Sequence, residues 1–148
     1  MPLRCEIATQ DRLLFEGPAD EVIAPGSQGE IGVLPHHAAL LTTLDYGILR
    51  VRYEGKEDAF TIGGGVMEVL PDRVTVLADV GENVAEIDAA RSEQARARAE
   101  ELLKNRSALG DDEYRAIEAA LRRSNLRLGA VRRYRGRAGR PPARGEGE

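Results

Sequence analysis

The sequence predicts an α+β protein: an N-terminal β-sandwich, then a C-terminal antiparallel α-helical hairpin, then a short disordered tail. Before about residue 84, short segments of alternating polarity and many β-branched residues are separated by turn-forming residues. From Asp88 onward the chain is rich in Ala, Arg, Glu and Gln, which favour helices. The last residues are rich in Arg, Gly and Pro and lack apolar periodicity. We therefore divide the chain into residues 1–84, 85–133 and 134–148.

The length allows one sizeable core with a small accessory unit, since the chain has 148 residues and 42% hydrophobic content. No apolar run approaches the roughly 18 residues that a membrane-spanning helix needs, and the N-terminus lacks the pattern of a signal peptide. The single cysteine, Cys5, excludes an internal disulfide framework and fits a reducing compartment. We therefore expect a soluble, cytoplasmic protein.

Six segments are predicted to be strands because they alternate in polarity and are rich in β-branched residues: 3–8, 29–34, 48–53, 58–62, 66–70 and 73–78. Glu54-Gly55 and Pro71-Asp72 are short enough for hairpin turns, whereas Pro25-Gly26 and residues 45–47 are expected to break the chain between strands. Short connections of this kind favour antiparallel neighbours in a sandwich or barrel.

Two helices are predicted after the strands. Asp88 is a good N-cap for a first helix that extends to about Ala108, and residues 109–112 combine a stop at Gly110 with a new cap. The short turn implies antiparallel helices. Their expected apolar stripes are narrow and rich in alanine, so they bury little area at about 25 cal/mol/Å² and should hold the hairpin weakly. The stripes comprise Ala95, Ala99 and Leu102 in the first helix and Tyr114, Ile117, Leu121 and Leu128 in the second.

Charge is divided unevenly along the chain. Residues 1–84 carry 6 basic and 14 acidic side chains, a net charge of −8, whereas residues 85–148 carry 15 and 11, a net charge of +4. The two parts should therefore face different electrostatic partners. The arginine-rich tail, with Tyr134 among its arginines, leaves open an alternative function: a free-standing adaptor that binds nucleic acid or an acidic protein.

The residues that most resemble catalytic motifs are better explained by structure. Gly63-Gly64-Gly65 lacks the following Lys-Ser/Thr of a phosphate loop and continues into a strand, so close backbone approach at a strand bend is the better interpretation. His36 and His37 are adjacent, would point to opposite sides of an extended chain, and have no second ligand cluster. An enzyme is not indicated, because no nucleophile, base or metal ligands cluster in the sequence.

Four segments of the chain nevertheless carry a recognisable pattern. They are Gly-Glu-Ile-Gly-Val-Leu-Pro-His-His-Ala at 29–38 with Leu-Leu-Thr at 40–42, Phe-Thr-Ile-Gly-Gly-Gly-Val at 60–66, Val-Thr-Val-Leu-Ala-Asp at 74–79, and Ile-Asp-Ala-Ala-Arg at 87–91. Their order and spacing resemble the epsilon subunit of F-type ATP synthases, from the first strand to about Val131. The resemblance implies a ten-stranded β-sandwich followed by an α-helical hairpin.

The resemblance also implies a mechanical function without catalysis. Such a subunit occurs in one copy in a hetero-oligomeric complex, clamps the foot of the gamma subunit and rests on the polar loops of the c-ring. It requires no cofactor, does not insert into the membrane, binds no nucleic acid, and lies at the cytoplasmic face of the bacterial inner membrane. Glu30 matches the position that faces the c-ring, and His37 matches a histidine of the gamma-facing region, where packing or hydrogen bonding is an equal alternative.

In this family the hairpin is a regulatory element that folds on the sandwich or extends into the α/β catalytic head and blocks ATP hydrolysis. A thinly packed hairpin suits two states that differ by a few kcal/mol. Arg122, Arg123 and Arg127 of the second helix are expected to meet acidic surface of the catalytic head, the alternative being a solvated arginine face.

Some bacterial members bind ATP as a regulatory ligand in the folded hairpin. The matching positions are Glu82, Ile87, Asp88, Arg91, Arg123 and Arg127. Asp88 would cap the first helix while the arginines gather around phosphates. The family's small apolar residue after the motif arginine is Ser92 here, which bears on affinity. Capping and ion pairing alone are an alternative role for the same residues.

Overall fold

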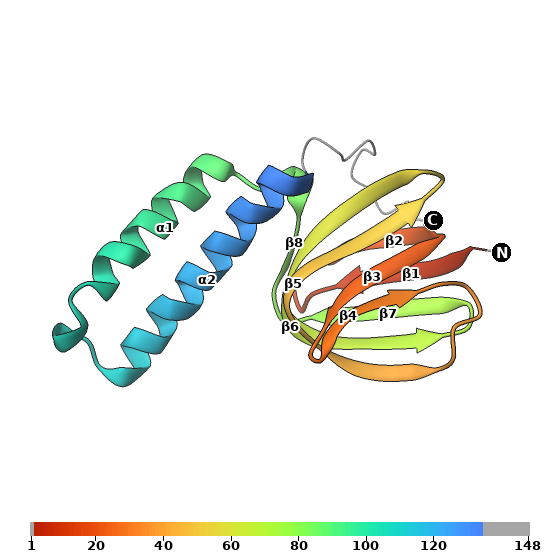
Figure 1. The fold of residues 1–148 in the computed structure, drawn as a ribbon, viewed down its shortest axis with the longest axis horizontal. Coiled ribbons are helices and arrows are strands. Elements are labelled where there is room, and N and C mark those ends of the chain that lie inside the picture. Colours follow the sequence, from red (N-terminus) through yellow and green to blue (C-terminus); the bar gives the residue numbers. More distant parts are fainter. Residues whose placement is uncertain (1, 135–148) are drawn as a thin grey trace.

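The computed structural model describes residues 2–134, and the tail predicted for 134–148 lies outside them except for Tyr134. The described chain forms a β-sandwich with a helical hairpin beside it (Figure 1). The strands are β1 (Leu3–Ala8), β2 (Leu13–Ala19), β3 (Glu21–Gly26), β4 (Gly29–Val33), β5 (Leu40–Tyr53), β6 (Lys56–Leu70), β7 (Arg73–Ala78) and β8 (Gly81–Asn83).

The eight strands form one continuous sheet that folds over into two layers (Figure 1). Their order is β2-β1-β7-β6-β5-β3-β4, and β8 pairs with β6. The predicted antiparallel pairing is confirmed for these strands except between β1 and β7, which run parallel. The family's ten strands agree approximately with this count, since β5 and β6 are 14 and 15 residues long.

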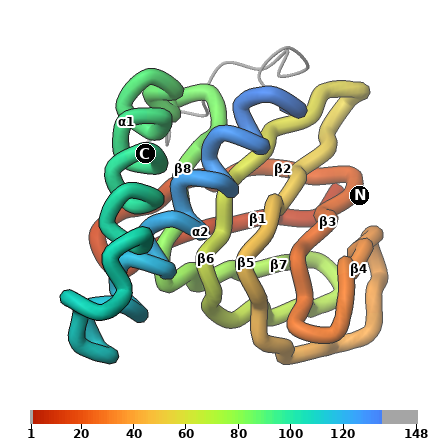
Figure 2. The backbone as a smooth tube through the Cα atoms, turned by 60° about the vertical axis from the view of Figure 1, so that its left-hand side comes forward, coloured from red at the N-terminus to blue at the C-terminus, as the bar shows by residue number. Residues whose placement is uncertain are grey.

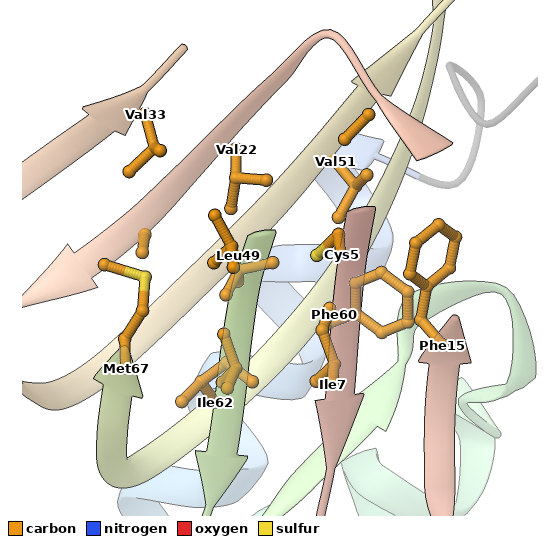
Figure 3. Close-up of a cluster of buried hydrophobic side chains, with 14 of the residues drawn as sticks. Cys5, Ile7, Phe15, Val22, Val33, Leu49, Val51, Phe60, Ile62 and Met67 are labelled. Carbon is orange, nitrogen blue, oxygen red and sulfur yellow. The ribbon is translucent and has the colours of Figure 1, made fainter. Parts of the chain in front are cut away.

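The core lies between the two layers and is built from inward-facing residues of nearly every strand (Figure 3). Phe15 and Phe60 pack edge to face with ring centroids 5.7 Å apart, a favourable aromatic geometry. Cys5 is fully buried in the same core. Its position therefore explains it as a packing residue.

The predicted hairpin turns at Glu54-Gly55 and Pro71-Asp72 are confirmed. The prediction for residues 45–47 was wrong, because β5 continues through them and Tyr46 pairs with Gly63. A Cβ at Gly47 would lie 2.5 Å from Cβ of Pro25, so this glycine serves close packing of β3 on β5 instead of a turn. The break expected at Pro25-Gly26 falls immediately after it, at residues 27–28.

The hairpin consists of α1 (Ala89–Leu103) and α2 (Asp111–Tyr134), which lie side by side (Figure 2). Asp88 caps α1 as predicted: its Oδ1 accepts the Arg91 backbone N–H at 3.0 Å. The predicted end near Ala108 was wrong, because α1 ends at Leu103 and a 3-10 turn follows at Arg106–Ala108. Arg106 holds this turn, with its guanidinium 3.9 Å from the centroid of the Tyr114 ring and an ion pair to Asp111 at 3.2 Å.

The apolar stripe predicted for α1 was also partly wrong. Ala95 and Leu102 are exposed, whereas Ser92 and Ala99 are buried. The stripe of α2 is half-buried as expected. In the described part of the hairpin, the fully buried side chains are small ones: Ser92, Ala99, Ser124 and Ala130.

The C-terminal end of α2 attaches the hairpin to the sandwich. Ala130 packs with Ala59 of β6, Val84 and Ile87, and the half-buried Ile48, Val131 and Tyr134 surround this cluster. The contact is apolar but small. No helix in the described residues is long and apolar enough to cross a membrane.

Candidate functional surfaces

A polar cleft of about 770 Å³ opens where the start of α1 meets β8 and α2. It brings together five of the six residues predicted for nucleotide binding. Arg123, the sixth, lines the adjoining space between α2 and the sandwich. The cleft is lined by Glu82, Glu86, Ile87, Asp88, Arg91, Ser92, Gln94, Ala95, Arg98 and Arg127.

Charge in this cleft is partly compensated within the chain. Arg127 forms an ion pair with Glu82, and both side chains are less than a third exposed, at 29% and 27%. In residues 2–134, neither Arg91 nor Arg98 has a carboxylate partner. The N-terminal turn of α1 lies beside these two guanidinium groups, although Asp88 already accepts the Arg91 backbone N–H there. The lining also carries the carboxylates of Glu82, Glu86 and Asp88, so an anion in this cleft would bind through Arg91 and Arg98.

Sequence reasoning missed Arg98 and Gln94 as lining residues. Residues 91, 94 and 98 are spaced by three and four positions, which places them on one face of a helix. This spacing could have identified both residues once Asp88 was known to cap α1. Ser92, where the departure from the family pattern was expected to matter, is buried and also lines the cleft.

Glu30 lies next to the tip of the β3–β4 hairpin, where Gly29 has a φ of +127°. Its side chain is 60% exposed and forms an ion pair of 2.9 Å with Arg50. His37 follows β4 in a loop and is half-buried, with Nδ1 2.7 Å from the Ala38 carbonyl oxygen. A ring N–H donating to that carbonyl would fix the imidazole in place.

A row of exposed side chains crosses the outer face of the sheet, and sequence reasoning missed it. The strand register aligns Leu13 with Ala8, Ala8 with Leu77, Leu77 with Val66, and Val66 with Thr43. Leu13, Val66 and Leu77 are 45%, 39% and 55% exposed. Five neighbouring strands thus present a continuous, largely apolar surface, which we call the apolar row.

The arginines expected to meet another subunit are turned toward the sandwich in this structure. The Arg122 guanidinium lies over the Tyr46 ring, 5.1 Å from its centroid. Arg127 pairs with Glu82, and Arg123 lines the space between them. The structure therefore shows the hairpin docked, with its arginines engaged within the chain.

Two family models together account for most of the chain. Residues 2–84 match the beta-sandwich domain of the ATP synthase Delta/Epsilon chain, and residues 85–132 match its long alpha-helix domain. The chain belongs to the ATP synthase delta/epsilon family. The resemblance inferred from the sequence is thereby confirmed, as is the sandwich-plus-hairpin fold.

Individual relatives agree with this assignment to the ATP synthase delta/epsilon family. The ATP synthase epsilon chain of Herpetosiphon aurantiacus is 44% identical over 137 residues, covering 93% of this chain and 99% of the relative. That of Pelotomaculum thermopropionicum is 50% identical over 100 residues, covering 68% and 75%. A chain in the Euglena gracilis mitochondrial ATP synthase (OSCP/F1/c-ring) superimposes with a TM-score of 0.74 at 25% identity, covering 88% of this chain and 81% of that chain.

Family membership also answers the question of catalysis. The epsilon chain is a non-catalytic subunit of the ATP synthase complex, so the prediction that this protein is not an enzyme is confirmed. It belongs to the central stalk, which favours the rotor interpretation over a free-standing adaptor.

Proposed function

We propose that this epsilon chain holds the gamma subunit with the outer face of its sandwich, transmits c-ring rotation to the catalytic head, and inhibits ATP hydrolysis through its hairpin. The apolar row carries the proposal, because an exposed strip over five strands needs a partner in a long-lived complex. The similar Euglena gracilis chain comes from an assembly of OSCP, F1 and the c-ring, which supports the same setting.

The proposed contacts occupy different parts of the sandwich. The apolar row faces gamma, as does His37 in the β4–β5 loop. Glu30, on the exposed β3–β4 hairpin, faces the polar loops of the c-ring, where its ion pair with Arg50 could be exchanged for a basic side chain of the ring. The chain then lies peripherally at the cytoplasmic face of a bacterial inner membrane, in one copy per complex.

Charge reversal within the apolar row tests the gamma contact. Leu77→Glu should weaken binding of purified gamma at least about 10-fold, because a leucine contributes roughly 1.5–3 kcal/mol on burial and a buried carboxylate opposes association. Leu102→Glu is the matched control, since Leu102 is similarly exposed at 46% but lies in α1. Equal binding by both variants would contradict the proposed surface.

The hairpin's inhibitory role is tested separately. Removal of the chain from Asp88 onward should leave gamma binding intact and raise ATP hydrolysis by the reconstituted complex. The support is the small hairpin–sandwich contact, which allows release of Arg122, Arg123 and Arg127 toward acidic surface of the head. Unchanged hydrolysis would refute inhibition while sparing the rotor function.

We further propose that the polar cleft binds ATP as a regulatory ligand and thereby favours the docked hairpin. Two arginines without carboxylate partners beside a helix N-terminus support a phosphate site, and Arg127 could join after leaving Glu82. Titration calorimetry with Mg-free ATP should show saturable binding that Arg91→Ala abolishes and Arg115→Ala, on exposed surface of α2, preserves. No heat at millimolar ATP would leave the hairpin controlled by rotation alone.

A further inference from the structure

Tyr46 occupies an unusual place at the border between the sandwich and the hairpin. It pairs across strands with Gly63 of β6. A Cβ at Gly63 would lie 3.2 Å from Cε1 of Tyr46 and 3.4 Å from Cβ of Val80. The missing side chain therefore leaves room for the tyrosine ring to lie against β6, where a larger residue would push it away.

The ring placed in this way meets α2. The Arg122 guanidinium lies over it at 5.1 Å from the centroid, within the range of a cation–π contact. Tyr46 is half-buried, so the contact is partly shielded from water. Five residues further along α2, Arg127 pairs with Glu82. The space between these two contacts is nearly filled, leaving about 10 Å³.

We propose that Tyr46 is a holding site for Arg122: the sandwich captures the docked hairpin through this ring and so withholds Arg122 from a second partner. The inference rests on the proposed switch of the hairpin. While Arg122 lies over Tyr46, α2 stays against the sandwich, so the guanidinium cannot also reach a surface that only the released hairpin contacts. Tyr46 therefore shifts the ratio of docked to released hairpin toward the docked form.

The expected size of the effect follows from the contact's partial exposure. A cation–π contact at such a site changes the ratio of docked to released hairpin by roughly 2- to 5-fold. Loss of the ring should therefore raise the released fraction by that factor without unfolding the sandwich. Tyr46→Phe keeps the ring and should change little, because the contact uses the ring face and not the hydroxyl.

The docking ratio can be measured in the full chain by thiol labelling. Ala130 is 1% exposed in the contact between α2 and the sandwich, so the thiol of an Ala130→Cys variant reacts only when the hairpin is released. Cys5, fully buried in the sandwich core, reports global unfolding in the same sample. We expect Tyr46→Ala to speed labelling at position 130 about 2- to 5-fold and to leave the labelling rate of Cys5 unchanged.

If Tyr46→Ala also speeds labelling of Cys5, the substitution has destabilised the sandwich itself. Variants in α2 then test the contact from the other side. Arg122→Ala leaves the sandwich sequence intact and should accelerate position 130 as Tyr46→Ala does, whereas Arg115→Ala should not. Combined with Tyr46→Ala, Arg122→Ala should add no further increase, because one contact is already lost. The proposal would be overturned if Arg122→Ala left labelling at position 130 unchanged. It would also be overturned if the effects of Arg122→Ala and Tyr46→Ala were fully additive in the double variant.

This experiment separates the holding site from the proposed inhibition. Faster labelling together with unchanged ATP hydrolysis after hairpin removal would retain the holding site and refute inhibition. Unchanged labelling together with increased hydrolysis would refute the holding site alone.

Discussion

Gly65 offers the sharpest test of how the β6 bend is built. It has a φ of +132°, which L-residues rarely adopt, and it pairs with Ala78 of β7. A Cβ at this position would lie 2.3 Å from the Leu77 carbonyl oxygen and 2.8 Å from the Ala78 Cα. Both are backbone atoms, so they cannot move aside by a change of rotamer.

The cost of Gly65→Ala combines two effects. An L-residue held at such a φ costs about 1–3 kcal/mol, and overpacking against fixed atoms typically adds about 1–3 kcal/mol. We therefore expect the free energy of unfolding to fall by about 2–6 kcal/mol. For a small domain this lowers Tm by roughly 10 °C or more.

Urea unfolding followed by circular dichroism measures this loss. Gly129→Ala is the matched control, because Gly129 lies within α2 and a Cβ there meets no atom within 4 Å. That substitution should stabilise the chain by about 0.5–1 kcal/mol. A loss below about 1 kcal/mol for Gly65→Ala would show that close approach does not set the bend, and would reopen a ligand-binding role for the glycine run at 63–65.

Three further predictions concern a cap, a titration and the core. Asp88→Ala should cost about 1 kcal/mol of stability and Asp88→Asn much less, measured by urea unfolding, because the Arg91 N–H would lose its acceptor. The hydrogen bond from Arg96 lowers the pKa of Glu93 below its ordinary value of 4.5, so its stabilising effect is complete above that pH and lost as pH falls through the folded pKa. Carboxyl-carbon NMR titration should show the low pKa, and Arg96→Gln should restore the ordinary one. Phe60→Ala should cost about 3–5 kcal/mol in thermal unfolding, since Phe60 is fully buried.

Local chemistry explains which parts of the fold could be predicted from the sequence. Glu54-Gly55 forms its hairpin turn with φ values of +50° and +77°, a conformation that glycine favours at the second position. Asp88 caps α1 because a short carboxylate there reaches the backbone N–H three residues later. In both cases the decisive atoms belong to neighbouring residues, so sequence alone carries the information.

The elements that were missed depend on distant contacts. β2 and β3 include Gly17, Pro18 and Pro25, which disfavour a strand prediction, yet β3 has partners on both sides and its residues 22–24 are buried. The stripe predicted for α1 was partly wrong because alanine and serine are both small: hydrophobicity favoured Ala95, whereas Ser92 is the residue that is buried.

The candidate sites also differ in whether local sequence patterns or contacts between distant residues define them. Family resemblance brought Glu82, Asp88 and Arg91 to one cleft, and helical spacing could have added Arg98. The apolar row could not be read from the sequence, because it requires the register of β2, β1, β7, β6 and β5 together. Tyr46 was not recognised as a contact residue, because residues 45–47 were predicted to break the chain between strands.

The uneven charge of the chain favours contact between its own two parts. The acidic sandwich and the basic hairpin attract one another, and Arg127 with Glu82 is a direct instance of that attraction. Because these arginines are partly exposed, water compensates much of the loss when they leave, so the two contacts together bias the hairpin only modestly. If the hairpin is released as we propose, an acidic surface on another subunit would compete with Glu82 for Arg127 and with Tyr46 for Arg122.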